Sequence, residues 1–380
     1  MKKLWAVPIL FAASQATAGG WEASTLDTSF MYQQGNYAEV GTASVTYDVK
    51  ATTQGNSAKT KMAKNQTRTA FAFKTDVGGI TLGLARYMSG AIQLSGGDAA
   101  KAGCVPDPTS LAIGLCSVVP SADVTVNSLA LLAKYKLNDE FSLLAGANQY
   151  SIASGANVTA LTGYYEVSGD ATVPTFGAAY EVSDIALRVE LIAQSETKVS
   201  NFKAQSHFAA AGNVTALTDV AAESMRIPAS TKLNFQSGVA ENTLLFGSIN
   251  QVNWKSAQIV IPAIGDGSAG TGVDGISSSF ASKTTYSIGV GRKFTEQISG
   301  LISYATEAGG GKTTADAFTL RNGYQSISLG GRYTAGNMTI SGGYNYTLPG
   351  DVELTHPSTL TASYKNNTVS AFGLKLGFSF

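Results

Sequence analysis

The chain has few charged residues, and this low content narrows the classes of protein to which it can belong. Only 14% of its residues are charged, against roughly 25% in soluble domains. The 26 basic and 26 acidic residues balance, which gives no indication of a nucleic-acid partner. After Ala13 there is no apolar run of about 18 residues or more, so the sequence predicts no transmembrane helix.

Cysteine and histidine are too scarce to indicate a catalytic or metal centre. Cys104 and Cys116 favour a disulfide that closes a loop in an oxidising compartment, whereas the alternative, a metal site, lacks nearby histidines. The two histidines, His207 and His356, fall in expected loops, and no set of catalytic partners accompanies them. A membrane lipase or acyltransferase is therefore disfavoured, and we predict no catalytic residue, no metal and no cofactor.

An export signal stands at the start of the sequence. Two lysines precede an apolar stretch at 4–13, and small residues at 16–18 form a cleavage pattern. The apolar stretch is about half as long as a membrane-spanning helix. We therefore predict a removable signal peptide over residues 1–18. Its loss leaves 24 basic and 26 acidic residues, a net charge near −2.

The rest of the chain shows the period-two alternation of strands. In 372–380, FGLKLGFSF, apolar side chains alternate with Gly, Lys and Ser up to the terminal Phe380. Export, alternation and the absence of an apolar helix together predict an all-β transmembrane antiparallel barrel of about 14 strands in the bacterial outer membrane. The expected strands are 37–49, 66–75, 78–88, 126–137, 140–151, 173–182, 184–197, 228–240, 242–255, 283–294, 297–307, 325–334, 337–347 and 369–380.

The connections between these strands alternate between six short turns and seven long loops. Outer-membrane barrels have short periplasmic turns and long external loops, so we expect both termini on the periplasmic side. The Ala-rich connection 198–227 suggests short external helices. A basic run in the first loop could attract anionic substrates or lipid phosphates, and the alternative is an ordinary solvated loop. This run consists of Lys59, Lys61, Lys64 and Arg68.

Charged residues within strands are expected to face the lumen, because a charge on the lipid face costs roughly 2–4 kcal/mol near the membrane midplane. Arg188 and Lys232 are candidates to hold an anionic headgroup inside the barrel. The alternative is a lumen-side ion pair such as that of Arg188 with Glu190. The full set expected to face the lumen is Arg188, Glu190, Lys232, Asn234 and Lys375.

Three segments resemble the long-chain fatty-acid transporter family (FadL). They are IPASTKLNFQSGVAENTLLFGSINQVNWKSAQIVIP at 227–262, GNYAEV at 35–40 and the C-terminal FGLKLGFSF. The resemblance implies a barrel plugged by an N-terminal hatch, with a lateral opening at a kink in the third strand. Gly79 and Gly83 are the kink candidates, or else small lumen residues. This chain lacks the Asn-Pro-Ala element of longer members, so their internal site is not transferred.

The irregular segment 19–36 is the expected hatch, followed by the barrel at 37–380. A barrel of fourteen strands leaves an open lumen unless something occupies it, and the segment carries apolar residues suited to a plug that touches the ligand route. The alternative is a frayed terminus in the periplasm. The expected plug residues are Trp21, Phe30, Met31 and Tyr32.

These observations predict passive transport of long-chain fatty acids or similar hydrophobic compounds. The expected partners are hydrophobic small molecules, outer-membrane lipids and, through the strand that ends at Phe380, the barrel-assembly machinery. A general diffusion porin is one alternative, and it predicts an open lumen lined by charge. A surface adhesin or structural barrel that acts through its loops is another.

Overall fold

The computed structural model describes most of the chain as β-strands. The described residues are 21–53, 56–95, 121–153, 157–160, 163–207, 209–210, 213–214, 218–220, 225–261, 276–311, 313–314, 318, 320–355 and 361–380. The expected signal peptide at 1–18 and both cysteines, Cys104 and Cys116, lie outside them. No helix in these ranges is long and apolar enough to cross a membrane.

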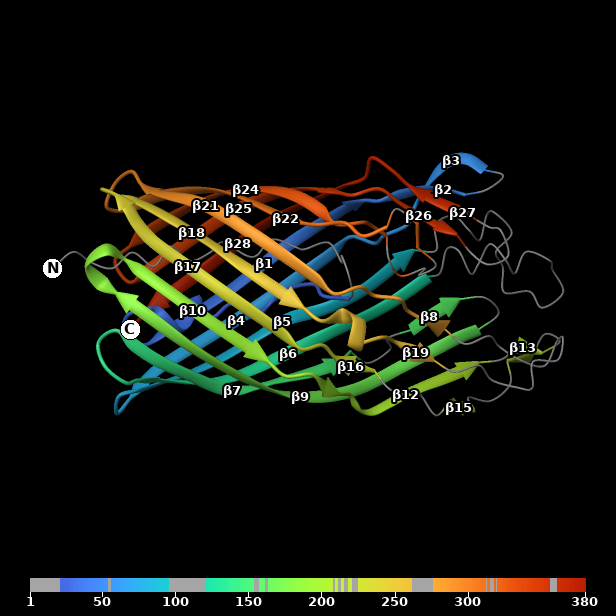
Figure 1. The fold of residues 1–380 in the computed structure, drawn as a ribbon, viewed down its shortest axis with the longest axis horizontal. Helices are drawn as coiled ribbons and strands as arrows, with labels where there is room; N and C mark the ends of the chain where they lie inside the picture. Colours follow the sequence, from blue (N-terminus) through green and yellow to red (C-terminus); the bar gives the residue numbers. More distant parts are fainter. Residues whose placement is uncertain are drawn as a thin grey trace.

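Fourteen antiparallel strands close into a barrel, as the alternation predicts. The barrel strands belong to a 17-stranded sheet, which also contains β8, β12 and β15. The first barrel strand pairs with the last along its whole length, from Tyr37 opposite Ser379 to Asp48 opposite Thr368, so the barrel has no free edge (Figure 1). The strands are β1 (Tyr37–Asp48), β4 (Gln66–Val77), β5 (Ile80–Ser95), β6 (Ser121–Lys136), β7 (Phe141–Ile152), β9 (Gly163–Val182), β10 (Leu187–Gln194), β17 (Ser230–Ala240), β18 (Thr243–Val252), β21 (Lys283–Lys293), β22 (Ile298–Glu307), β24 (Tyr324–Ala335), β25 (Met338–Pro349) and β28 (Thr368–Ser379).

Short turns gather at one end of the barrel and long connections at the other, as expected (Figure 1). The chain termini of the barrel meet at the short-turn end, where the Asn36 N–H donates to the Phe380 carbonyl and the Phe380 N–H donates to the Asn36 carbonyl. The turn between β4 and β5 is formed by Gly78 and Gly79. Both have positive φ, a conformation that glycine adopts without strain.

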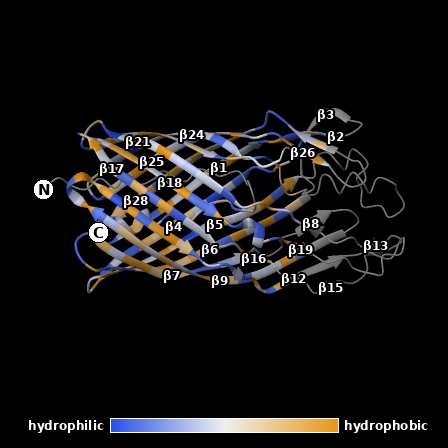
Figure 2. Cartoon of the chain, in the orientation of Figure 1, coloured by the Kyte–Doolittle hydropathy of each residue, from blue (hydrophilic) through white to orange (hydrophobic). Residues whose placement is uncertain are grey.

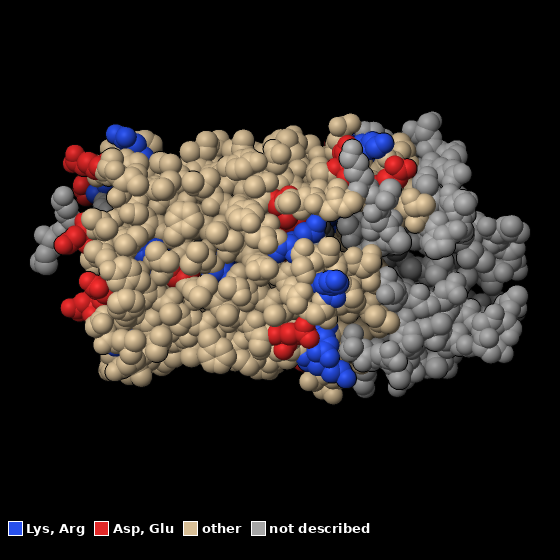
Figure 3. All heavy atoms as spheres, in the orientation of Figure 1, with Lys and Arg blue, Asp and Glu red and all other residues tan. Residues whose placement is uncertain are grey.

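The outward face of the wall is apolar and the inward face carries the polar side chains. In β28, Leu374 and Leu376 are 46% and 49% exposed, whereas Lys375 between them is 6% exposed. Figure 2 shows hydrophobic and hydrophilic residues alternating along the strands. On the face in Figure 3, most of the described charged side chains lie toward the two ends of the barrel. This apolar outer surface is the one that a membrane-embedded barrel presents to lipid.

Strands also build the external end of the barrel. The expected helices at 198–227 are wrong for the described residues, which form β11, β12, β13, β14, β15 and β16. Pairing explains the difference, because Ser200–His207 lies against β9, whose 20 residues extend well beyond the expected 173–182. The short strands are β2 (Lys50–Thr53), β3 (Asn56–Lys61), β8 (Asn157–Ala160), β11 (Thr197–Lys198), β12 (Ser200–His207), β13 (Ala209–Ala210), β14 (Asn213–Val214), β15 (Thr218–Val220), β16 (Arg226–Ile227), β19 (Val260–Ile261), β20 (Ile276–Ser277), β23 (Thr313–Thr314), β26 (Val352–Thr355) and β27 (Thr361–Tyr364).

The described residues also contain three 3-10 turns: η1 (Ser29–Tyr32), η3 (Ser183–Ile185) and η4 (Trp254–Ser256). The first lies in the N-terminal segment, the name used here for residues 21–36, which precede β1. In this segment Trp21, Phe30 and Met31 are buried.

Candidate functional site

The hydrogen-bonded wall has a window between β4 and β5. The two strands pair from Val77 opposite Ile80 to Phe71 opposite Arg86. Beyond that point, residues 66–70 of β4 still pair with β1 but not with β5. Toward the long-loop end of the barrel, the residues before β4 contact β5 again, because the Lys64 N–H donates to the Gln93 carbonyl.

A β-bulge on β5 lies at this window. Met88 pairs with Asn127 of β6 and Gly90 pairs with Val126, so Ser89 is an extra residue in the ladder, and its hydroxyl donates to the Val126 carbonyl at 3.2 Å. A bulge bends its strand and ends regular pairing. The bulge therefore accounts for the separation of β5 from β4.

The N-terminal segment takes the place of β4 beside the bulge. The Ala23 N–H donates to the Ser89 carbonyl, and the Ala91 N–H donates to the Trp21 carbonyl, both at 2.8 Å. On the other side of the window, Arg68 of β4 donates to the Ala23 carbonyl. The first described residues of the chain thus lie between the two strands.

Two glycines of β5 allow the segment to approach the wall closely. A Cβ on Gly90 would overlap the Trp21 ring, and a Cβ on Gly83 would overlap Met31 Sδ. The Trp21 ring also packs edge-on against Trp254, with the ring centroids 5.2 Å apart. Apolar contact therefore holds the segment along the inner face of the wall.

A polar cluster on β10 and β17 holds the middle of the segment. The Thr28 and Tyr32 hydroxyls donate to Glu190 at 2.7 and 2.6 Å, and the Asn234 amide donates to the same carboxylate at 2.9 Å. The Tyr32 ring has the Arg188 guanidinium 4.1 Å from its centroid. Charge-assisted hydrogen bonds are stronger than neutral ones, so Glu190 is a main anchor of the segment.

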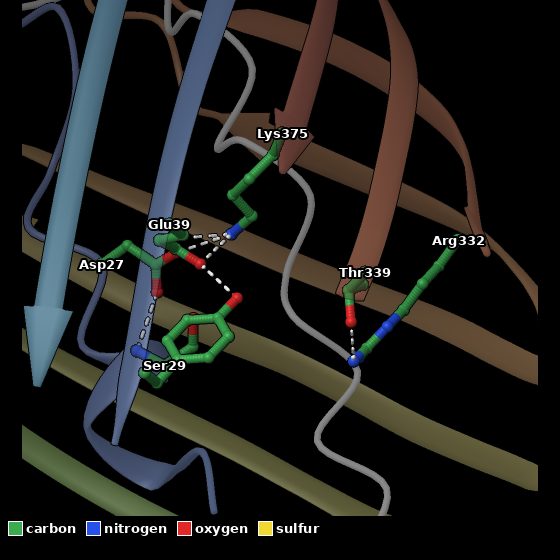
Figure 4. Close-up of polar contacts among 7 residues, drawn as sticks. Asp27, Ser29, Glu39, Arg332, Thr339 and Lys375 are labelled. Atoms are coloured by element: carbon green, nitrogen blue, oxygen red, sulfur yellow. Dashed lines mark hydrogen bonds and ion pairs between the residues drawn. The ribbon is translucent and has the colours of Figure 1, made fainter. Parts of the chain in front are cut away.

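A second anchor lies near the start of β1. Lys375 Nζ is 3.2 Å from Glu39 Oε2 and 4.0 Å from Asp27 Oδ2 of the segment. The Tyr37 hydroxyl also donates to Glu39. Figure 4 shows Lys375 pointing toward both carboxylates, with Arg332 directed to Thr339 nearby.

A pocket adjoins the window on the lumen side, and we call it the inner cavity. Apolar atoms form most of its surface, but ten of its seventeen lining residues carry polar side chains, so polar groups also converge on it. Lys232 is one of these groups, and its Nζ donates to the Thr25 hydroxyl at 3.0 Å. The apolar lining includes Trp21, Leu26, Ile192, Ile227, Val252 and Trp254, and the polar lining includes Glu22, Tyr87, Tyr150, Gln194 and Lys232.

The residues predicted from the sequence are distributed around this region. Trp21 and Lys232 line the inner cavity. Phe30 and Met31 pack against the wall at Gly83, and Tyr32 receives Arg188 on its ring. Their part in ligand binding stays a prediction.

Other predicted residues have different places. Gly79 lies in the turn before β5, and Gly83 pairs regularly with both neighbouring strands, so neither is at the bulge. Arg188 donates to Gln236, and the ion pair with Glu190 that we considered does not form between these two described side chains. In the basic run, Lys64 pairs with Asp123, while Arg68 is buried at the window.

Sequence reasoning missed three residues that matter to the arrangement. Ser89 gives no local signal, because a bulge is visible only from the pairing of two strands. The sequence places Arg68 in the basic run of the first loop, although Arg68 belongs to β4. Trp254 lies in the segment that carries the family resemblance, and the signal that could have identified it is an aromatic ring near the end of the expected strand 242–255.

The architecture matches solved outer-membrane channels, whereas no family model and no curated protein matches the chain. A FadL homologue of Pseudomonas aeruginosa is 14% identical, with a TM-score of 0.70 over 93% of this chain and 92% of that one. The toluene transporter TodX of Pseudomonas putida is 13% identical, with a TM-score of 0.62 over all of both chains. The toluene transporter TbuX of Ralstonia pickettii is 13% identical, with a TM-score of 0.62 over 97% of each chain. The chain therefore has the fold of the FadL-like channels, a closed barrel of fourteen antiparallel strands.

Proposed function

We infer that this barrel conducts long-chain fatty acids or similar hydrophobic compounds passively across the outer membrane. The observation that carries the proposal is the window between β4 and β5, which lies beside a largely apolar cavity. Two of the similar structures are named toluene transporters, which supports a hydrophobic ligand. The process is binding and diffusion, and it needs no catalytic residue.

Release is proposed to occur sideways through the window. A hydrophobic ligand that leaves the inner cavity into lipid avoids the cost of exposing its surface to water, about 25 cal/mol per Å². The window is closed by three backbone hydrogen bonds between the segment and β5, one of them long at 3.4 Å, and by Arg68. Each hydrogen bond contributes only about 1 kcal/mol net, so the segment is able to leave β5 without unfolding the barrel.

We further propose that residues 19–36 act as a hatch and that residues 37–380 form the channel itself. The anchors at Glu190 and Lys375 support this division, because they hold the segment from the lumen side at two points. The same contacts disfavour a general diffusion porin, whose lumen is open to water. No contact in the described residues favours an adhesin.

Deleting Ser89 tests lateral release. The deletion makes Met88 and Gly90 consecutive and restores regular pairing with β6, so β5 is able to continue beside β4 and close the window. We expect cellular uptake of a hydrophobic tracer to fall toward that of cells without the protein. Ser89→Ala keeps the extra residue and loses only the hydroxyl hydrogen bond to the Val126 carbonyl, so it is the matched control, with uptake near that of the original protein. Unchanged uptake in the deletion variant would exclude this exit.

Deletion of residues 21–34 tests the hatch in the same assays. We expect ion conductance in planar bilayers to rise, because the lumen loses its plug, and selective uptake to fall. The Ser89 deletion should leave conductance low, since it keeps the segment. If the original protein already forms a large, stable open pore, a general porin is the better description.

A further inference from the structure

Two polar side chains that line the inner cavity have no hydrogen-bond partner among the described residues. Asn250 of β18 is only 4% exposed, yet its amide makes no hydrogen bond to any of them. The carboxylate of Glu22, in the N-terminal segment, likewise has no hydrogen bond or ion pair within the described part of the chain. Buried polar groups are nearly always satisfied in native proteins. Both groups therefore require a partner inside the cavity.

Backbone pairing fixes the positions of these two groups. Asn250 lies opposite Lys232 in the ladder of β17 and β18, and directly opposed residues share a face of the sheet. Lys232 in turn donates to Thr25 of the segment, so this face is the inward one. Glu22 forms an isolated β-bridge with Gly90 of β5, beside the window. The inner cavity thus lies between the wall and the segment, with Asn250 on the wall and Glu22 on the segment.

The polar groups of the inner cavity favour a neutral ligand with a hydroxyl group. Glu22 and Lys232 are the charged residues that line the cavity, one of each sign, and Lys232 is already bonded to Thr25. The Glu22 carboxylate repels an anionic end group, whereas a pure hydrocarbon leaves Glu22 and Asn250 unsatisfied, which costs free energy. A hydroxyl is both a donor and an acceptor. It is therefore able to satisfy a carboxylate and an amide N–H at the same time.

We propose that the inner cavity binds neutral hydrophobic compounds that carry a hydroxyl group, which donates to the Glu22 carboxylate and accepts from the Asn250 amide. The hydrocarbon part of the ligand packs against the Trp21 and Trp254 rings. This inference rests on the proposed function and narrows its substrate class from hydrophobic compounds in general to hydroxylated ones. Glu22 supplies most of the discrimination, because a hydrogen bond to a charged group is stronger than one between neutral groups.

The test compares 1-dodecanol with two probes of similar size. Its isomer 1-methoxyundecane accepts a hydrogen bond but is unable to donate one, and dodecanoate is anionic. The protein is reconstituted in phosphatidylcholine vesicles, and protein-free vesicles provide the reference for partitioning into lipid. Tryptophan fluorescence reports binding, because Trp21 and Trp254 are the only tryptophans in the sequence after the predicted signal peptide and both line the inner cavity.

We expect the original protein to bind 1-dodecanol about tenfold more tightly than the ether, the effect of one hydrogen bond to a charged group, and also more tightly than dodecanoate. Glu22→Met should remove the advantage of the alcohol over the ether, because the acceptor is lost, and should strengthen dodecanoate binding. Asn250→Leu should weaken the alcohol and the ether alike by about fivefold, since the oxygen of each accepts from the amide.

Equal binding of the alcohol and the ether by the original protein would overturn the hydroxyl site, and so would a preference for dodecanoate. In both cases hydrophobic transport stands. Equal loss of the two neutral probes in Glu22→Met would also overturn the site, because Glu22 would then only hold the segment in place. If none of the three probes binds beyond the level of protein-free vesicles, the proposed function itself fails.

Discussion

Single glycines decide how close the N-terminal segment comes to the wall. Gly83 lies on the inward face of β5, and the space that a side chain would take is occupied by Met31 and Phe30. Both of these residues are buried. The fit is one of complementary shape, with the large side chains on the segment and the small residue on the barrel.

Gly83→Leu should therefore displace the segment. Overpacking a filled site costs about 1–3 kcal/mol, and the cheapest relief is movement of residues 30–31 away from β5. We expect ion conductance in planar bilayers to rise relative to the original protein. Gly331→Leu is the matched control, because a Cβ at this position of β24 meets no atom within 4 Å. Conductance that rises equally in both variants would argue against the contact.

At the scale of elements, the middle of the segment is held by side chains of β10 and β17. Glu190 of this strand accepts hydrogen bonds from Thr28 and Tyr32, and Lys232 of the neighbouring β17 donates to Thr25. These partners are far apart in sequence; Thr28 and Glu190, for example, are separated by 162 positions. The barrel is thus a rigid frame on which a short irregular segment is positioned by side chains.

Glu190→Ala should loosen the segment while leaving the barrel intact. Losing two hydrogen bonds to a charged group weakens its attachment by about 3 kcal/mol, which corresponds to roughly a hundredfold faster exchange of amide hydrogens that open with it. Hydrogen-exchange mass spectrometry of residues 21–36 measures this rate. Glu241→Ala, in the exposed turn between β17 and β18, is the control. Equal exchange in the two variants would place the anchor elsewhere.

The whole molecule is a barrel sorted into an apolar outside and a polar inside. Lys375 is accommodated because it points inward to Glu39, whereas its neighbour Leu374 points outward. The same sorting holds around the closed sheet, so the stability of the molecule depends on which side of the wall each residue occupies.

A lysine introduced at position 374, next to the inward-facing Lys375, tests this separation of outward and inward residues. Leu374→Lys places a charge on the outward face, and we expect the free energy of unfolding to fall by about 2–4 kcal/mol. Ser370→Lys, nearer the external end of the same strand, should cost only about 0–1 kcal/mol. Denaturant titration of the protein in lipid vesicles measures both values. Equal costs would contradict the placement of Leu374 deep in the membrane.

The sequence by itself determined the barrel, because strand alternation is a local pattern with a period of two. All fourteen expected strands are present, and the alternating placement of Arg188, Glu190 and Lys375 toward the lumen follows from the same pattern. Local pattern failed at 198–227, where Ala-rich sequence suggested helices but pairing with β9 supplied the backbone hydrogen bonds.

Only the tertiary structure decided where the wall opens and what lies in the opening. The bulge at Ser89 is defined by its pairing with β6, and the place of Trp21 beside β5 depends on contacts across the lumen. Likewise, nothing in the local sequence distinguishes Arg321 from an ordinary loop residue, whereas in the closed barrel it is buried beside Tyr324. Such features arise when distant parts of the chain meet, and no periodicity along the sequence encodes that meeting.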